Sequence, residues 1–354
     1  MERSSYLIKP ASSLCNMNCK YCFYSDVSHN RSDYSKGIMK KDVVDILIEK
    51  ALNESQNITF AFQGGEPTVA GIEYFKYFIN KVNQEKKDHT IEYAIQTNGL
   101  LIDKEWIEIF KENNFLVGVS LDGYKSNHES IRLKQGEGTF DQVMNTLYLL
   151  KQNEIDYNVL TVVTSSLAKY PKQVYEFFKD NEIDHIQFIP CLPELDQSTQ
   201  NYELKPKEFY SFYKGIYELW KEDISKGKMI SISLFDNLAM LFKGIYPHTC
   251  GMLGQCQLQM IIEADGSIYP CDFYALDKYK LGNIVFDEIS EIRKSQVLHQ
   301  FLKEEKNYCK LCKHCKFYKV CQGNCKRMNI VYFDENYCGY QQFLEETYKE
   351  FYNL

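Results

Sequence analysis

The sequence lacks the long apolar segments that form membrane-spanning helices, since no run of about 18 apolar residues occurs in its 354 residues. Its N-terminal segment also lacks the apolar core of a signal peptide. Positive charge is not in excess, because 48 Asp and Glu outnumber 41 Lys and Arg and leave a net charge of −7. This charge balance argues against sequence-independent binding to the phosphate backbone of a nucleic acid. We therefore expect a soluble, cytoplasmic protein with neither a membrane nor a nucleic-acid partner.

Internal repeats and low-complexity tracts are also missing, whereas cysteine is abundant, with 13 residues. Cytosolic thiols stay reduced, so metal ligation explains them better than disulfide bonds do. Cys15, Cys19 and Cys22 follow the spacing C-x3-C-x2-C and precede an aromatic residue. Three thiolates hold three irons of a [4Fe–4S] cube and leave the fourth iron open to a ligand, whereas four close it. The alternatives are a zinc knuckle or buried thiols, but zinc normally takes four ligands and this segment contains no histidine.

The first half of the sequence alternates short β-branched runs with longer amphipathic stretches, which is typical of a parallel sheet with helices between its strands. The predicted strands are 6–9, 58–63, 91–97, 116–120, 158–163 and 185–189. The predicted helices are 41–53, 72–85, 104–113, 140–152 and 171–181, with a further helix at about 207–226.

Polar residues follow several of these strands. Gly65 and Glu66 belong to a Gly-Gly-Glu-Pro turn after the second strand, and glycines let backbone approach a ligand closely. Asn98 ends the third strand, and Ser120 and Asp122 end the fourth. The carboxyl ends of barrel strands carry the chemistry of such folds, although polar residues there also simply start turns.

The cysteine triad, the Gly-Gly-Glu-Pro turn about 40 residues later and the six strand–helix units closely resemble the radical SAM enzymes. The resemblance implies an α/β fold, a partial (β/α)6 TIM-like barrel. It also implies that S-adenosylmethionine chelates the open iron and yields a 5'-deoxyadenosyl radical. The positions that match the family's cofactor contacts are Tyr21, Gly65, Glu66, Ser120, Arg132 and Leu192. The alternative for Arg132 is a solvated charge on a helix face, and the alternative for Tyr21 and Leu192 is ordinary packing.

The C-terminal cysteines resemble the SPASM domain of radical SAM enzymes that modify peptides and proteins. The resemblance implies two auxiliary [4Fe–4S] clusters, one held by Cys250, Cys256, Cys271 and Cys325 and the other by Cys312, Cys315, Cys321 and Cys338. Spacing alone also permits a local cube on Cys312, Cys315, Cys321 and Cys325, or a zinc ribbon. Cys191 and Cys309 receive no role. The expected domains are a barrel at 1–192, a linker and helical segment at 193–245 and the SPASM domain at 246–354.

An alternating pattern around Asp265-Gly266 predicts a hairpin that presents Cys271 and Asp272. The following hexapeptide, residues 269–274 (Tyr-Pro-Cys-Asp-Phe-Tyr), matches the anaerobic sulfatase-maturating enzymes, as do residues 7–13, 60–67 and 281–284. In that family the aspartate is the general base, a role that burial favours by raising its pKa. The alternative is an acceptor that orders the cluster loop.

This resemblance implies oxidation of a sulfatase cysteine or serine to Cα-formylglycine. The implied partners are a sulfatase polypeptide or another peptide, and an electron donor such as flavodoxin or ferredoxin. The chain departs from the family at Asn324, where a glycine is usual, and at Ile131, where asparagine is common. A SPASM maturase that forms a thioether, a carbon–carbon bond or an epimer is the first alternative. A non-enzymatic metal-binding module is the second.

Overall fold

The computed structural model describes residues 3–196 and 201–353, so residues 197–200 of the predicted linker lie outside the described residues. The chain forms two compact units that alternate along the sequence. The first unit comprises Met1–Ser120, Arg132–Tyr157 and Leu258–Glu304, and the second comprises Leu121–Ile131, Asn158–Gln257 and Glu305–Leu354. Each unit is described by itself below.

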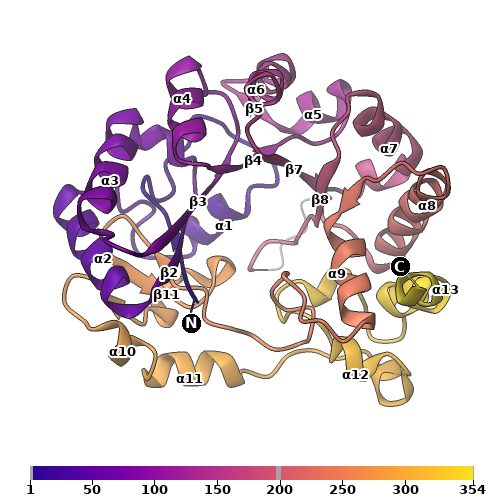
Figure 1. The fold of residues 1–354 in the computed structure, drawn as a ribbon. Coiled ribbons are helices and arrows are strands. Elements are labelled where there is room, and N and C mark those ends of the chain that lie inside the picture. Colours follow the sequence, from indigo (N-terminus) through magenta and orange to yellow (C-terminus); the bar gives the residue numbers. More distant parts are fainter. Residues whose placement is uncertain (1–2, 197–200, 354) are drawn as a thin grey trace. The chain divides into compact units, whose positions relative to one another are not determined.

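The first unit is built on strands in the order β12-β11-β10-β1-β2-β3-β4. Strands β1 to β4 are parallel, and every second side chain of β2 is buried. Figure 1 shows α2, α3 and α4 on the outer side of these strands. The strands are β1 (Arg3–Ile8), β2 (Asn57–Phe62), β3 (Thr90–Thr97), β4 (Leu116–Ser120), β5 (Leu133–Lys134), β6 (Glu137–Gly138), β10 (Ile261–Ile262), β11 (Ser267–Tyr269) and β12 (Gly282–Asn283). The helices are α1 (Phe23–His29), α2 (Lys41–Glu54), η1 (Pro67–Ala70), α3 (Ile72–Glu85), α4 (Lys104–Glu112), α6 (Phe140–Gln152), η3 (Asp272–Tyr274), η4 (Asp277–Tyr279), α10 (Ile289–Ile292) and α11 (Gln296–Lys303).

The core of the first unit is aromatic. Phe62 contacts Phe75 and Phe78 of α3 edge to face, with ring centroids 4.9 and 5.1 Å apart. Phe115 stacks on Tyr93 at 5.0 Å. Because these rings pack between the sheet and the helices that follow each strand, they hold the carboxyl ends of the strands in place.

The late hairpin extends the same sheet from its β1 edge. Strands β10 and β11 pair antiparallel around the Asp265-Gly266 turn, where Gly266 has a φ of +81°, as predicted. Strand β10 also pairs in parallel with β1, with Leu7 opposite Ile261 and Ile8 opposite Ile262. The pairing therefore sets residues that follow position 262 beside residues that follow position 8.

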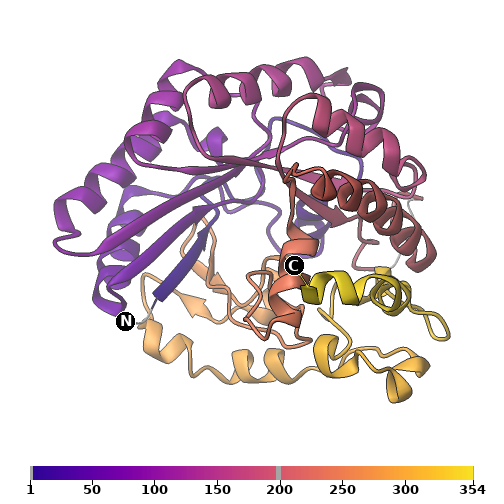
Figure 2. The same cartoon turned by 45° about the vertical axis from the view of Figure 1, so that its right-hand side comes forward.

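The second unit contains the parallel strands β7, β8 and β9. Its long helices α8 and α13 lie side by side, as Figures 1 and 2 show, and share an aromatic core that includes Tyr217, Phe343 and Phe351. The strands are β7 (Tyr157–Val163), β8 (His185–Pro190) and β9 (Ser231–Ile232). The helices are α5 (Lys125–Ile131), η2 (Leu167–Lys169), α7 (Pro171–Asp180), α8 (Pro206–Ser225), α9 (Ser233–Phe242), η5 (Lys310–His314), α12 (Tyr318–Cys321), η6 (Asn329–Val331) and α13 (Gly339–Asn353).

All six predicted strands and all six predicted helices are present, with ends that differ by three residues or fewer. Helix α13 was not predicted. Among the residues that the structure describes, no helix is both long and apolar enough to cross a membrane.

Candidate active site

The three N-terminal cysteines lie on the loop that leads into α1. Cys22 is the residue before the helix, and its backbone N–H donates to the Cys19 carbonyl over 3.2 Å. Cys15 is exposed as a residue, yet burial of its thiol, together with the nearby Glu66, Cys19 and Cys22, raises its pKa to about 12. The loop thus gathers its three thiols within electrostatic reach of one another, as ligands of one cluster require.

The Gly-Gly-Glu-Pro turn packs against the segment that precedes this loop. A Cβ on Gly65, whose φ is +42°, would lie 2.3 Å from the Leu14 carbonyl oxygen. A Cβ on Gly64, whose φ is +90°, would lie 2.3 Å from Cε of Lys9. Only glycine fits at either position, so the turn and the cysteine loop are held in direct contact.

Glu66 is buried, and both of its carboxylate oxygens accept hydrogen bonds. Oε1 accepts from the N–H of Thr68 at 3.1 Å, its hydroxyl at 2.6 Å and the Thr97 hydroxyl at 2.7 Å. Oε2 accepts from the backbone N–H of Asn98 at 2.6 Å. Burial raises the pKa of Glu66, and these donors oppose the shift. The carboxylate therefore ties the turn to the end of β3.

Other predicted site residues are also brought together in the first unit. The Asn98 amide donates to Oδ1 of Asn16, inside the cysteine loop, over 2.7 Å. Arg132 donates to the Tyr21 hydroxyl over 2.8 Å and is 7% exposed, so it is not a solvated helix charge. The Ser120 hydroxyl accepts from Gln96 over 3.1 Å.

Two predicted positions belong to the second unit. Asp122 is buried there and accepts from the backbone N–H of Val162 over 2.9 Å, which is a structural use of its carboxylate. Leu192 follows β8 and is half-buried. Its expected part in an adenine pocket stays a prediction.

Asp272 is buried at the end of the late hairpin, beside α1. Its Oδ2 accepts from the Tyr24 hydroxyl over 2.5 Å. Its Oδ1 has no hydrogen-bond partner among the described residues and lies 3.9 Å from the Lys9 ammonium. The neighbouring Phe23 and Phe273 rings contact each other at 5.0 Å. The residues that follow Cys22 therefore pack directly on those that follow Cys271.

A buried ionic cluster that the sequence analysis missed surrounds this carboxylate. The Lys9 ammonium lies 3.0 Å from Oε1 of Glu263, and the Arg31 guanidinium lies 2.6 Å from the same oxygen. The charges of Lys9 and Arg31 outweigh burial and lower the pKa of Glu263 to about 2. Burial raises the pKa of Asp272, and the charge of Lys9 opposes that shift. The pairing of β1 with β10 places Lys9 beside Glu263.

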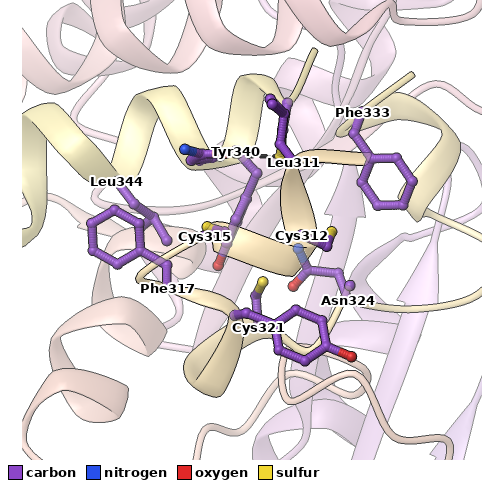
Figure 3. Close-up of a pocket in the computed structure, with 13 residues that line it drawn as sticks. Leu311, Cys312, Cys315, Phe317, Cys321, Asn324, Phe333, Tyr340 and Leu344 are labelled. Atoms are coloured by element: carbon purple, nitrogen blue, oxygen red, sulfur yellow. Dashed lines mark hydrogen bonds between the residues drawn. The ribbon is translucent and has the colours of Figure 1, made fainter. Parts of the chain in front are cut away.

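The C-terminal cysteines of the second unit form two groups. One pocket is lined by Cys312, Cys315, Cys321 and Cys338, together with aromatic and aliphatic side chains. Figure 3 shows Cys312, Cys315 and Cys321 around the same space. Cys325 is not among the lining residues. It lies against the loop of Cys250, where a Cβ on Gly251 would come within 2.6 Å of the Cys325 Cβ.

A tight single-ion site is not formed among residues 3–196 and 201–353, since no three His, Cys, Asp or Glu side chains converge closely enough to hold one metal ion. A [4Fe–4S] cube places each cysteine on a different iron, so its ligands stand farther apart than those of a single ion. Four cysteines spread around a common pocket suit such a cube.

Comparisons with known proteins agree with this geometry. Residues 10–178 match the family profile of the radical SAM superfamily, and residues 250–316 match that of an iron–sulfur cluster-binding (SPASM) domain. The chain is 40% identical to the cysteine-type anaerobic sulfatase-maturating enzyme of Clostridium novyi, over 98% of this chain and 96% of that protein. It is 30% identical to the serine-type enzyme of Bacteroides thetaiotaomicron, over 91% and 82% of the two chains.

A solved structure is also similar. Native anSMEcpe with bound AdoMet and the Kp18Cys peptide has a TM-score of 0.92 to this chain, at 38% identity and with 99% of each chain covered.

Proposed function

The chain belongs to the anaerobic sulfatase-maturating enzymes of the radical SAM superfamily, which oxidise a sulfatase residue to Cα-formylglycine, and we propose that the residue it oxidises is a cysteine. Cysteine is favoured because the chain is 40% identical to a cysteine-type enzyme and 30% identical to a serine-type enzyme. One observation supports the oxidation chemistry above the others. A buried carboxylate, Asp272, is tied through Tyr24 to the helix that starts at Cys22 and keeps one oxygen without a donor among the described residues. Such an oxygen is placed to accept a proton from a substrate.

Three cysteines, Cys15, Cys19 and Cys22, are proposed to hold the catalytic [4Fe–4S] cluster. When bound, this cluster and S-adenosylmethionine supply a 5'-deoxyadenosyl radical that removes one Cβ hydrogen from the substrate. The proposed contacts with the nucleoside are Tyr21, Gly65, Glu66, Ser120, Arg132 and Leu192. The burial of Arg132 and its bond to Tyr21 support a binding role, because a buried guanidinium favours a carboxylate partner.

The substrate side of the reaction then requires the loss of one proton and one electron. Asp272 is proposed to take the proton from the substrate thiol at Oδ1, while the Tyr24 hydroxyl holds Oδ2. An auxiliary cluster, when bound by the SPASM cysteines, would accept the electron. Loss of the proton and the electron makes the carbon–sulfur single bond the double bond of a thioaldehyde. Water then converts the thioaldehyde to the aldehyde with release of hydrogen sulfide. For a serine, the same losses yield the aldehyde directly.

Two auxiliary [4Fe–4S] clusters are proposed in the SPASM domain. The pocket shared by Cys312, Cys315, Cys321 and Cys338 supports that ligand set over the local alternative with Cys325. The contact of Cys325 with the loop of Cys250 supports the second set, Cys250, Cys256, Cys271 and Cys325, in which Cys271 is assigned by the family resemblance. Four thiolates close a cluster and suit it to electron transfer.

The physiological partners follow from the chemistry. The substrate is proposed to be a sulfatase polypeptide. The electron that starts each turnover is proposed to come from a low-potential one-electron carrier such as flavodoxin or ferredoxin. The protein is proposed to act in the cytoplasm, where its thiols stay reduced.

The test is anaerobic incubation of the reduced, iron-loaded protein with S-adenosylmethionine and a Cys-x-Pro-x-Arg peptide, followed by mass spectrometry. Conversion of the cysteine to an aldehyde, trapped by a hydrazine, is expected, with a serine peptide as the comparison. A thioether or an epimer in place of the aldehyde would identify a different maturase. Absence of 5'-deoxyadenosine would leave only a metal-binding module.

A further inference from the structure

Lys306 joins two cysteine loops of the second unit. Its ammonium donates to the Gly254 carbonyl over 2.5 Å and to the Asn324 carbonyl over 2.9 Å. Gly254 lies between Cys250 and Cys256, and Asn324 lies between Cys321 and Cys325. The Lys306 ammonium is therefore bound by backbone carbonyls from loops of both proposed auxiliary ligand sets.

The two loops meet backbone to backbone at this point. Gly254 has a φ of +67°, and a Cβ there would lie 2.5 Å from the Gln322 carbonyl oxygen. The Lys306 ammonium also lies 5.5 Å from the centre of the Tyr308 ring. The two backbone carbonyls and the Tyr308 ring thus fix the position of the Lys306 ammonium.

The charge of Lys306 interacts with cysteines of both ligand sets. Its electrostatic partners are Cys256 and Cys325 of one set and Cys312 and Cys321 of the other. Burial lowers the pKa of Lys306, and these four thiols oppose that shift. Among the described residues, no carboxylate lies within ion-pair distance of its ammonium. The cysteine thiolates of the bound clusters would therefore be its anionic neighbours.

A fixed cation beside a thiolate-bound iron–sulfur cluster stabilises the reduced form more than the oxidised form, because reduction adds one negative charge. We propose that Lys306 raises the reduction potentials of both auxiliary clusters and so makes them better acceptors of the substrate electron. This inference rests on the proposed cluster ligands. Lys306 acts on the clusters through its charge and is not a catalytic residue.

The experiment uses the full chain with Cys15, Cys19 and Cys22 replaced by alanine, so that only auxiliary clusters contribute to the signal. Iron content is measured first, and reduction is then followed by electron paramagnetic resonance during a potentiometric titration. Lys306→Met removes the charge at similar length, and Lys306→Arg keeps it. Lys349→Met makes the same charge change at an exposed position of α13 in the same unit.

Lys306→Met is expected to lower the equilibrium constant for one-electron reduction by about tenfold, which corresponds to about 59 mV. Lys306→Arg is expected to recover most of this shift, and Lys349→Met to cause none. In the enzyme with its catalytic cysteines intact, Lys306→Met should also raise the ratio of 5'-deoxyadenosine to aldehyde. That ratio would increase because the substrate radical loses its electron more slowly.

Unchanged potentials in Lys306→Met with full iron content would overturn the inference. Equal shifts in Lys306→Met and Lys306→Arg would also overturn it, since they would assign the effect to loop geometry. Loss of iron from both Lys306 variants, with unchanged potentials for the clusters that remain, would make Lys306 a structural tie only. A parent protein with less iron than two cubes need would instead count against the proposed ligand sets.

Discussion

Two buried carboxylates in the first unit, Glu66 after β2 and Asp272 after β11, differ in how their oxygens are used. Glu66 accepts four hydrogen bonds from neutral donors of Thr68, Thr97 and Asn98. Asp272 accepts one, from Tyr24, and its other oxygen faces the Lys9 ammonium at 3.9 Å. Burial raises the pKa of both groups. Burial and pKa alone therefore do not distinguish these two carboxylates, whereas the count of hydrogen-bonded oxygens does.

The two carboxylates also differ in the charge of their neighbours. Neutral donors hold Glu66 locally, within 32 residues of sequence, whereas Lys9, Arg31 and Glu263 meet across more than 230 residues. A buried ion cluster of this kind is sensitive to the loss of any one member, because the remaining charges stay desolvated. We expect substitution of Asp272 by its amide to reduce catalysis more than stability, and the matched substitution of Glu66 to reduce stability more than that of Asp272 does.

The largest expected effect is on catalysis at the open oxygen. Asp272→Asn keeps the acceptor for Tyr24 but removes the base, so aldehyde formation should fall by about 10²- to 10⁴-fold. Cleavage of S-adenosylmethionine should continue, which liquid chromatography of 5'-deoxyadenosine will measure. Asp265→Asn, in the exposed turn of the same hairpin, is the control and should leave both rates unchanged. An unchanged aldehyde yield in Asp272→Asn would remove Asp272 from the role of base.

The ionic cluster should show strong coupling. Lys9→Met leaves Glu263 with Arg31 alone, and we expect a loss of about 3 kcal/mol in the free energy of unfolding, measured in urea on the metal-free protein. Adding Glu263→Gln to Lys9→Met should destabilise the protein by less than the sum of the two single changes. Additive losses would show that the two groups do not act as a buried pair.

The pH dependence of stability should reveal Glu263. Its pKa falls from 4.5 to about 2 on folding, so its contribution is fully present above pH 4.5 and disappears as the pH falls toward 2. The full contribution is about 3 kcal/mol. Urea unfolding of the metal-free protein at pH 6, 4 and 3 should therefore show the wild type approaching Glu263→Gln in stability. A constant difference between the two across this range would contradict the lowered pKa.

The smallest expected effect is on stability at the saturated site. Glu66→Gln sets an amide N–H against the backbone N–H of either Asn98 or Thr68, which should cost about 1–3 kcal/mol of unfolding free energy. Asp272→Asn should cost less, because Oδ1 has no donor to lose among the described residues. Equal losses in the two variants would remove the distinction between the sites.

Much of this protein was predictable from local sequence. The spacing of Cys15, Cys19 and Cys22 indicated the radical SAM superfamily, and the spacing of the later cysteines indicated a SPASM domain, and both are confirmed by the family profiles. The six strand–helix units and the Asp-Gly hairpin follow from apolar periodicity and turn chemistry, and both are present. Arg132 and Tyr21 were each predicted, from resemblance alone, to contact the cofactor. The bond between them was not predicted, since no local signal marks a bond across 111 residues.

The sequence by itself determined which groups this protein has for its chemistry, because cysteine spacing, glycine turns and apolar periods act over a few neighbouring residues. Tertiary structure alone decided how those groups are used. The pairing of β1 with β10 buried Lys9 beside Glu263, and the packing of α1 on the late hairpin occupied one oxygen of Asp272 and left the other open. The physical reason is that a hydrogen-bond partner or counter-charge depends on distance in space, which local sequence does not encode.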